Sequence, residues 1–408
     1  MDVAILHHAA NPILGGVENV MRAHSRLLAE AGHRVRIVAG RGSQVDPDVD
    51  FVKIPSVDSQ APEVLTVKQA LDSGMVPPEF DRLTSEVELR LAEGLRGTEL
   101  IFAHNVCSLN KNLALTAALF RLSEKPASPR LVLWHHDLAW TTPRYRSELH
   151  PGYPWDLLRS DWPRAVQVTI SEFRRRELAA LLRVPTDRIR VVPNGIDVTG
   201  FLGIGAEAGE IVQRFALLEA APLLLLPVRI TRRKNIELAL QILQQLKKKH
   251  PDAMLLVTGP AGPHNPANRE YLDNLLALRK SLNLDDRAVF VSAASGSAIS
   301  DEALGALYRL ADALILTSTE EGFGIPILEA ALAGIPCFCP EIAPLRELGG
   351  EDIHYFPPGA DAALMAEQMS AVLSVSKPYV LRKRVLREHT WSRIYAEHLL
   401  PLLKEARQ

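Results

Sequence analysis

The sequence is poor in the features that mark several common classes of protein. Its 408 residues include only three cysteines, Cys107, Cys337 and Cys339. Three cysteines cannot build a disulfide framework, and they fit a reducing compartment. No stretch approaches the roughly 20 apolar residues that a membrane-spanning helix needs, and Met1 leads directly into a strand-like segment without a signal peptide. We therefore expect a cytoplasmic protein, and peripheral contact with the inner membrane face stays open as an alternative.

An excess of charge of one sign is also absent. The chain carries 46 Lys and Arg against 48 Asp and Glu, a formal net charge of -2, whereas a dedicated nucleic-acid binder normally has a basic balance. The histidines show no HExxH or similar metal-binding spacing, and no complete Gly-x-Gly-x-x-Gly dinucleotide fingerprint is present. We expect no nucleic-acid partner, no metal and no cofactor, and an NAD-dependent enzyme is disfavoured.

Short apolar runs alternate with amphipathic segments along the whole chain. This alternation is typical of parallel sheets built from strand–helix–strand units. In the first half the predicted strands are 3–6, 35–39, 100–103, 131–134, 166–170 and 190–193. In the second half they are 223–226, 254–257, 288–291, 313–316 and 336–339. The fold class is therefore α/β, with two doubly wound Rossmann-like domains, residues 1–198 and 199–388. Because ligands of such sheets bind beyond the carboxyl ends of strands, we expect the domains to face each other across a ligand-binding cleft.

The segment after strand 313–316 places two carboxylates around a glycine-rich loop. Glu321 falls in the loop above the strand, and Glu329 falls at or just beyond the first turn of a helix that Pro326 favours. Gly322 and Gly324 let the backbone approach a ligand, and free amides at the helix start can receive a phosphate. The alternative is a plain helix start, where acidic residues are favoured by the helix dipole.

A cationic loop follows the first strand of the second half. Arg229 offers a forked donor for phosphate, and Lys234 offers a mobile point charge. A solvated helix start is the alternative, but positive charge is unfavourable there without an anion. The two side chains are therefore candidates for neutralising a diphosphate.

Two features of the first half are weaker candidates. Gly16 lies in a glycine-rich turn after the first strand, where a tight turn alone would explain it. His136 follows strand 131–134 and could donate a hydrogen bond to a sugar hydroxyl, although a structural hydrogen bond explains it equally well. Four further histidines also end strands, with less support: His7, His8, His104 and His135.

Taken together, these segments resemble the retaining nucleotide-sugar glycosyltransferases of family 4, which have the GT-B fold. The similarity is collinear over almost the whole chain. The matching segments are Gly15-Gly-Val-Glu18, His136-Asp137, Ser171-Glu-Phe, Pro193-Asn-Gly-Ile-Asp197, Arg229-Ile-x-x-x-Lys234, Thr258-Gly-Pro260 and Glu321-Gly-Phe-Gly-Ile-Pro-Ile-Leu-Glu329. The resemblance also implies that residues 389–408 form a closing helix, starting near Trp391, that crosses back to the first domain.

The resemblance implies a role for each candidate residue. Glu321 would contact hydroxyls of the donor sugar, and Glu329 would bind the nucleotide ribose. Arg229 and Lys234 would grip the diphosphate, and His136 would touch the transferred sugar near the reacting carbon. With Glu321 these three form the expected catalytic set. The remaining donor-binding positions would be Gly16, Phe323, Gly324 and Ile325.

The sequence departs from the family pattern at three positions of these loops. Val228 stands where a glycine usually precedes the arginine, and Asn235 stands where a glycine usually follows the lysine. Thr317 replaces the customary proline before Ser318. The cationic loop is therefore expected to sit differently over the nucleotide, although both charged positions are intact.

The resemblance implies transfer of a hexosyl group with retained configuration, without a metal ion, the leaving diphosphate being held by Arg229 and Lys234. The partners would be a nucleotide-sugar donor and an acceptor that is a sugar, a lipid-linked sugar or a small molecule. We expect the acceptor to contact residues 57–96 and 141–162. Two alternatives stay open: a sugar-nucleotide epimerase or hydrolase, and a catalytically silent GT-B sugar-binding subunit.

Overall fold

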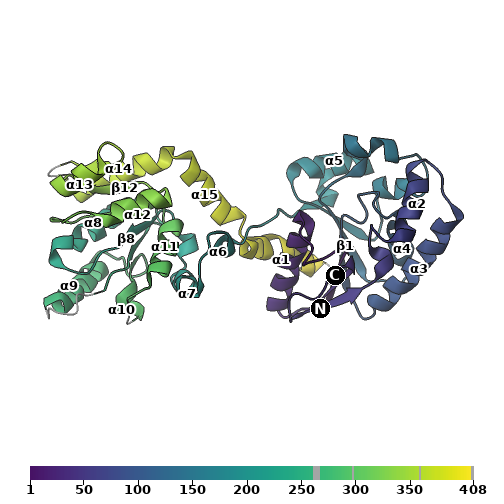
Figure 1. Cartoon of the computed structure of the whole chain (residues 1–408), viewed down its shortest axis with the longest axis horizontal. Coiled ribbons are helices and arrows are strands. Elements are labelled where there is room, and N and C mark those ends of the chain that lie inside the picture. The colour runs from purple at the N-terminus through teal and green to yellow at the C-terminus, as the bar shows by residue number, and fades with distance from the viewer. Residues whose placement is uncertain (261–266, 296–297, 358–359, 406–408) are drawn as a thin grey trace. The chain divides into compact units, whose positions relative to one another are not determined.

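The computed structural model describes residues 1–260, 267–295, 298–357 and 360–405. The chain divides into two compact units (Figure 1). The first unit contains Met1–Gly195 together with Trp391–Gln408, and the second contains Ile196–Thr390.

The first unit is built on one parallel sheet of seven strands, in the order β3-β2-β1-β4-β5-β6-β7. The strands are β1 (Asp2–Ala9), β2 (Arg34–Arg41), β3 (Val49–Lys53), β4 (Leu100–His104), β5 (Arg130–His135), β6 (Ala165–Thr169) and β7 (Ile189–Val191). The longer helices are α1 (Gly16–Glu30), α2 (Pro62–Asp72), α3 (Pro78–Gly94), α4 (Leu113–Ser123) and α5 (Glu172–Leu182). The strand order reverses between β1 and β4, so the loops after these two strands diverge and leave room for a ligand.

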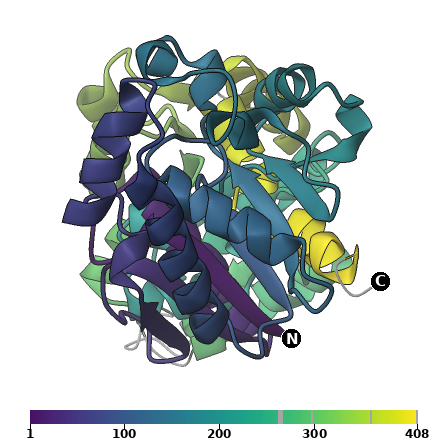
Figure 2. The ribbon, with the colours of Figure 1, turned by 90° about the vertical axis from the view of Figure 1, so that its right-hand side faces the viewer.

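Alternate residues of β1 belong to two separate cores. Val3 and Ile5 pack in a cluster with side chains of α1, whereas Ala4 and Leu6 pack in a cluster with side chains of α2, α3 and α4. Because successive side chains of a strand point to opposite faces, this alternation means that the sheet is covered on both sides. In Figure 2, helices coloured blue lie over this sheet and the yellow C-terminal segment lies beside it.

The end of the chain packs on the first unit. It consists of α16 (Trp391–Ile394), a π-helical turn (Tyr395–Leu399) and α17 (Leu400–Glu405). Its buried side chains join the cluster on the Val3 and Ile5 side of the sheet. Arg190 donates a hydrogen bond to the Glu405 carboxylate at 2.6 Å, which ties α17 to β7.

The second unit is built on a parallel sheet of six strands, in the order β10-β9-β8-β11-β12-β13. The strands are β8 (Leu223–Leu226), β9 (Met254–Val257), β10 (Ala288–Phe290), β11 (Ala313–Ile315), β12 (Cys337–Pro340) and β13 (His354–Phe356). The helices are α6 (Val198–Phe201), α7 (Ala206–Arg214), α8 (Ile236–Leu246), α9 (Ala267–Ser281), α10 (Val291–Ser295), α11 (Asp301–Leu310), α12 (Ile325–Ala333), α13 (Ala343–Gly349), α14 (Ala362–Val375) and α15 (Lys377–Glu388). Here the order reverses between β8 and β11, which places the loops after these strands at the switch point.

The prediction of an α/β fold with two Rossmann-like sheets is confirmed. Every predicted strand is present, but the predicted set omitted β3 and β13. Both are edge strands: one is five residues long with mixed burial, and the other is three residues long. A short, half-exposed edge strand carries little of the apolar pattern on which strand prediction depends.

Candidate active site

The centre of the candidate site is a group of three side chains from the loops after β8 and β11. The Nζ atom of Lys234 lies 2.5 Å from Oε1 of Glu321. The hydroxyl of Ser318 donates a hydrogen bond of 2.6 Å to the same carboxylate oxygen. The Lys234 and Glu321 side chains are only 11% and 10% exposed, so their attraction is weakly screened by water. The sequence predicted that both residues bind the donor, and the structure places them in direct contact.

Further hydrogen bonds join the two loops that carry this group. The Thr317 hydroxyl donates to the Lys234 carbonyl oxygen at 2.9 Å. The Thr319 amide donates to the Arg233 carbonyl at 2.8 Å, and the Arg233 guanidinium donates to the carbonyl of Glu320 at 3.2 Å. Thr317 therefore does something that the proline usual in the family cannot do, because proline has no side-chain donor.

The departure from the family pattern at Asn235 also has a local explanation. Asn235 has φ of 48°, in the left-handed region. Asparagine tolerates this region better than most residues, so it preserves the conformation that glycine would adopt. Val228 is buried, and a Cβ on Gly259 would lie 2.1 Å from the Val228 carbonyl oxygen. The glycine of the Thr258-Gly-Pro260 segment thus allows the loop after β9 to approach the cationic loop.

The loop between the two glutamates ends at the N-terminus of α12. Gly324 is the N-cap with φ of 104°, and a Cβ there would come within 2.6 Å of the Leu345 side chain. Within the described part of the chain, the backbone N–H groups of Phe323, Gly324 and Ile325 have no protein acceptor. Unpaired amides and the positive end of the helix dipole together favour an anion such as a phosphate.

Glu329 lies further along α12 and is held by a residue of the neighbouring helix α11. The hydroxyl of Tyr308 donates a hydrogen bond of 2.6 Å to the Glu329 carboxylate. Burial raises the pKa of Tyr308, and the hydrogen bond to Glu329 raises it further, so the hydroxyl keeps its proton. The orientation of the Glu329 carboxylate is therefore fixed from one side.

Arg229 contrasts with Lys234 in the same loop. Its side chain is exposed, and among the residues that the structure describes no carboxylate lies within ion-pair distance of its guanidinium. A guanidinium without an internal partner keeps its five donors available for a ligand.

His136 lies in the first unit, directly after β5. It is buried, and its Nε2 atom lies 3.0 Å from Nδ1 of His104. Its backbone N–H donates at 2.8 Å to the side-chain oxygen of Asn105, which has a left-handed φ of 56°. Burial lowers the pKa of His136 to about 3, and neighbouring histidines add to this effect. The ring is therefore neutral near pH 7, with Nδ1 as the nitrogen not used by His104.

Gly16 is the first residue of α1, which starts after β1. A Cβ on Gly16 would meet no atom within 4 Å, whereas a Cβ on Gly15 would lie 2.0 Å from the Glu18 carboxylate. Glu18 in turn lies 4.0 Å from Nε2 of His7. Open space beside Gly16 fits the expected close approach of a ligand, while a side chain at position 15 would require Glu18 to move.

The predicted residues thus fall into two groups. The second unit holds Arg229, Lys234, Glu321, Phe323, Gly324, Ile325 and Glu329, and the first unit holds Gly16 and His136. Sequence reasoning missed Tyr308 and Asn105, whose roles depend on contacts with residues 21 and 31 positions away. The spacing of the apolar residues in α11 carries no sign that the Tyr308 hydroxyl would face a carboxylate.

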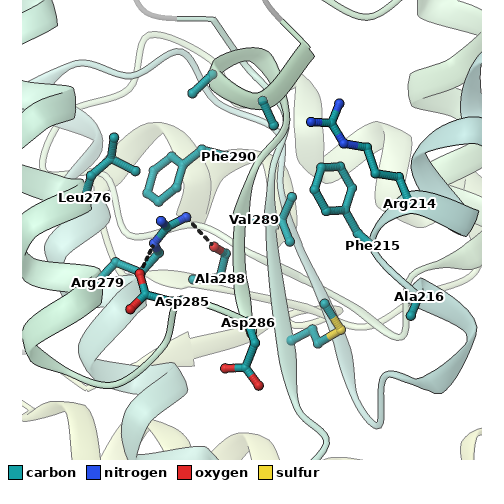
Figure 3. A pocket seen from close by; sticks show the side chains of 13 residues that line it. Arg214, Phe215, Ala216, Leu276, Arg279, Asp285, Asp286, Ala288, Val289 and Phe290 are labelled. Carbon is teal, nitrogen blue, oxygen red and sulfur yellow. Dashed lines mark hydrogen bonds and ion pairs between the residues drawn. The ribbon is translucent and has the colours of Figure 1, made fainter.

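A separate cavity of about 490 Å³ lies beside the edge strand β10. Figure 3 shows that Arg279 turns toward Asp285, with which it pairs at 3.2 Å, and toward the Ala288 carbonyl oxygen. None of the predicted site residues lines this cavity. This cavity is therefore not part of the candidate active site.

In the described parts of the chain, no group of three or more His, Cys, Asp or Glu is arranged to hold a metal ion. No helix there is sufficiently long and apolar to cross a membrane.

Two family models match the chain, one in each half. The model described as Glycosyltransferase Family 4 matches residues 14–199, and the model described as Glycosyl transferases group 1 matches residues 209–384. The chain is a glycosyltransferase of the family 4 type, with the two Rossmann-like domains of the GT-B class of fold.

Several curated proteins are similar over long segments. A mannosylglucosylglycerate synthase of Thermotoga maritima is 26% identical over 366 residues, which is 82% of this chain and 79% of that protein. An MMP alpha-(1->4)-mannosyltransferase of Mycolicibacterium hassiacum is 24% identical over 384 residues, 86% of this chain and 84% of that protein. An uncharacterized glycosyltransferase of Methanocaldococcus jannaschii is 25% identical over 240 residues, and the match spans 56% of this chain and 57% of that protein. Among solved structures, a glycosyltransferase from Rickettsia africae is 16% identical with a TM-score of 0.39, and the match covers 100% of this chain and 99% of that one.

Proposed function

We propose that the protein transfers a hexosyl group from a nucleotide diphosphate sugar to an acceptor hydroxyl, with retention of configuration and without a metal ion. The observation that carries this proposal is the placement of Lys234, Glu321 and the unpaired amides at the N-terminus of α12 around one switch point of a parallel sheet. In this position a cation and amides can bind phosphate, while a carboxylate beside them can accept hydrogen bonds from sugar hydroxyls.

The proposed donor lies along the loop from Glu321 to Glu329. Its diphosphate would take the N–H groups of Phe323 to Ile325 and the charges of Arg229 and Lys234. Glu329, oriented by the 2.6 Å hydrogen bond from Tyr308, would bind the ribose. This arrangement uses every charged group of the two loops that the sequence singled out.

The proposed reaction needs no protein nucleophile. The acceptor hydroxyl attacks from the face that the nucleotide leaves, and the departing phosphate takes the acceptor proton. Arg229, Lys234 and the loop amides stabilise the negative charge that develops on the phosphate, and loss of one such contact costs on the order of 10²–10³ in rate. His136, neutral because of its burial, would donate or accept a hydrogen bond at the transferred sugar.

The names of two relatives suggest which sugar to test first. The Mycolicibacterium hassiacum protein is named a mannosyltransferase, and the name of the Thermotoga maritima protein contains a mannosyl group. We therefore propose a mannosyl donor as the first candidate, with a sugar, a lipid-linked sugar or a small molecule as acceptor. The proposed location is the cytoplasm, with membrane contact if the acceptor is lipid-linked.

The test begins with the nucleotide. Thermal unfolding is measured with UDP, GDP and ADP, since a ligand at 100 times its dissociation constant adds about 2.7 kcal/mol to stability. The matching nucleotide sugars are then incubated with a panel of acceptors, and NMR reports the anomeric configuration of the product, with and without EDTA. A product of inverted configuration would exclude retention, and loss of turnover in EDTA would exclude metal independence.

The same incubation separates the two remaining candidates. A sugar-nucleotide epimerase or hydrolase would consume the donor without forming an acceptor-derived product. A catalytically silent subunit would bind the nucleotide and consume none. The intact set of two cations and two glutamates favours the transferase.

A further inference from the structure

A second polar cavity lies in the first unit, at the carboxyl ends of its strands. Its volume is about 440 Å³. It is lined by Arg41, Ser59, Gln60, Leu65, Lys68 and Lys111. Arg41 is the last residue of β2, and the other lining residues follow β3 or β4, so the cavity belongs to the ligand-binding edge of this sheet. The lining contains three cations and no carboxylate.

Two of these cations pair with carboxylates that are not part of the lining. Asp58 pairs with Nε of Arg41 at 2.7 Å. Asp72 and Glu148 pair with Nζ of Lys68 at 2.5 and 3.0 Å. Burial opposes the charge on Lys68, but the hydrogen bonds to the two carboxylates outweigh it and raise the pKa, so the side chain stays cationic. These ion pairs fix the positions of Arg41 and Lys68, and each of the two cations keeps further N–H donors available for a ligand.

Lys111 differs from the other two cations. Among the residues described, no carboxylate lies within ion-pair distance of its ammonium group. The loop on either side of it is nevertheless held: Asn110 donates to Glu148 at 2.7 Å, and Asn112 donates to the Ser56 carbonyl at 3.0 Å. A cation on a fixed loop without a protein partner is favourable only where an anion or bulk water solvates it.

The surroundings connect this cavity with the histidines of the same sheet edge. The charge of Lys111 contributes, after burial, to the lowered pKa values of His7 and His8. His7 bonds through Nδ1 to the carbonyl oxygen of His104, whose own ring bonds to His136. The cavity thus lies on the strand-end edge that also carries the residue expected to touch the transferred sugar.

From these observations we infer that the cavity binds the anionic group of the acceptor, and that the acceptor is a phosphorylated or carboxylated sugar or polyol. This inference rests on the proposed function, because a transferase must bind a second substrate and the second unit's loops are assigned to the donor. Lys111 supplies the unpaired charge, Arg41 and Lys68 supply further N–H donors, and Ser59 and Gln60 supply groups that match sugar hydroxyls. A phosphate and a carboxylate present the same chemistry to these residues, so experiment must distinguish them.

The central variant is Lys111→Gln, which removes the charge without breaking an ion pair of the described residues. Lys111→Arg keeps the charge. Lys249→Gln is the matched control, because it removes a lysine charge from the surface of the other unit, where Lys249 pairs with Glu367 at 3.1 Å. Thermal unfolding at neutral pH confirms that each variant is folded before kinetics are measured.

The first measurement is acceptor specificity, with a hexose phosphate, a hexuronate and the uncharged hexose offered at the same donor concentration. We expect one of the two anionic acceptors to be preferred, and its identity tells whether the site takes phosphate or carboxylate. Lys111→Gln should raise the KM for that acceptor about tenfold or more, because a hydrogen bond to a charged group contributes at least that factor. The KM for the donor should not change, Lys111→Arg should recover most of the loss, and Lys249→Gln should behave like the wild type. Equal use of the uncharged hexose, or an unchanged acceptor KM in Lys111→Gln, overturns the inference.

The second measurement needs no turnover. Binding of inorganic phosphate to the wild type, Lys111→Gln and Arg229→Ala is followed by calorimetry. Weaker binding in Lys111→Gln supports the site even if no donor is ever consumed, in which case the proposed function fails while the anion site stands. Weaker binding only in Arg229→Ala, or wild-type binding of neither phosphate nor acetate, which is measured in the same way, overturns the site and leaves the proposed function untouched.

Discussion

Lys234 and Glu321 form an ion pair of 2.5 Å although 87 residues separate them in the chain, and both side chains are about nine-tenths buried. Removing one partner of a buried pair leaves an uncompensated charge, which costs roughly 3–5 kcal/mol. The same two groups are proposed to hold the donor, so stability and transfer both depend on them.

Replacement of the pair by apolar residues should separate these two roles. Lys234→Met alone should lower the free energy of unfolding by about 3 kcal/mol, and the double variant Lys234→Met, Glu321→Leu should recover most of that loss. Neither variant should transfer sugar at more than about 10⁻² of the wild-type rate. Urea unfolding and product formation give the two readouts.

Arg233→Met is the matched stability control for this pair. Its guanidinium lies 3.8 Å from Oε2 of Glu321 but is 52% exposed. An exposed ion pair contributes less than about 1 kcal/mol, so this variant should unfold almost like the wild type. Equal destabilisation by Arg233→Met and Lys234→Met would contradict the importance of burial for the pair.

The Tyr308 hydroxyl should matter for nucleotide binding through Glu329. Tyr308→Phe removes the 2.6 Å hydrogen bond and leaves the ring in place. We expect the KM for the donor to rise by roughly tenfold, since a hydrogen bond to a charged group contributes about 1.5–3 kcal/mol and only part of it acts on the ligand. The kcat should change little, because the ribose is remote from the reacting carbon.

Tyr379→Phe provides the comparison for Tyr308→Phe. Tyr379 lies on α15 of the same unit, and its side chain contacts Lys383 through the ring. Loss of the Tyr379 hydroxyl should leave the KM for the donor unchanged. If Tyr308→Phe lowered kcat and left KM alone, the assignment of Glu329 to the ribose would be wrong.

The glycine loop allows a test with two substitutions two positions apart. Gly324 has a φ of 104°, and a Cβ at this position would lie 2.6 Å from the Leu345 side chain. Gly322 has no left-handed φ, and a Cβ there would meet no atom within 4 Å. We expect Gly324→Ala to lower the free energy of unfolding by about 1–3 kcal/mol and to reduce transfer. Gly322→Ala should keep the stability within about 1 kcal/mol of the wild type. Thermal unfolding of the two variants decides the matter, and equal effects would show that the strain at Gly324 is unimportant.

Much of the fold could be predicted from the local pattern of apolar residues. The apolar runs located β8 and β9 to the residue, because buried parallel strands carry a continuous apolar signal. The contact of Lys234 with Glu321 could not be predicted, since it depends on β8 and β11 being neighbours in the sheet. The sequence alone assigned both residues to ligand binding but did not show that they contact each other.

The hydrogen bond from Tyr308 to Glu329 shows the same limit at shorter range. A tyrosine at helical spacing is expected in the core, and burial of its ring agrees with that. Only the packing of α11 against α12 reveals that its hydroxyl reaches a carboxylate. Asn235 is a different case, because its substitution for glycine had a physical reason visible once the left-handed φ was known.

The first unit should be sensitive to mild acid because it buries several neutral histidines. Six of them have a lowered pKa with burial as the main cause: His7, His8, His24, His104, His135 and His136. In the unfolded chain each has a pKa near 6.5 and takes up a proton below that pH, while in the folded unit it does not. Stability is therefore fully present above about pH 7. It falls as the pH drops from 6.5 toward the folded-state pKa values, which are about 4 for His7 and His135 and about 3 for His24 and His136. Each histidine contributes up to about 1.4 kcal/mol per pH unit over this window.

His24 gives the sharpest test of this pH dependence. It is fully buried between Trp134 and Trp391, and in the described structure neither ring nitrogen has a hydrogen-bond partner. Burial lowers its pKa to about 3. His24→Leu should therefore keep the stability at pH 7.5 within about 1 kcal/mol, because no hydrogen bond is lost and the volume is similar. Between pH 6 and pH 4 it should be more stable than the wild type, by up to about 1.4 kcal/mol for each pH unit below 6.5.

Urea unfolding at several pH values measures the difference. His250→Leu is the comparison in the second unit, where burial and Lys249 lower the pKa less strongly and Ser370 bonds the ring at 2.8 Å. That variant should lose its hydrogen bond at every pH and gain little in acid. If His24→Leu followed the wild-type pH profile, then His24 would be protonated in the folded chain, and the desolvation of the ring would be smaller than its burial implies.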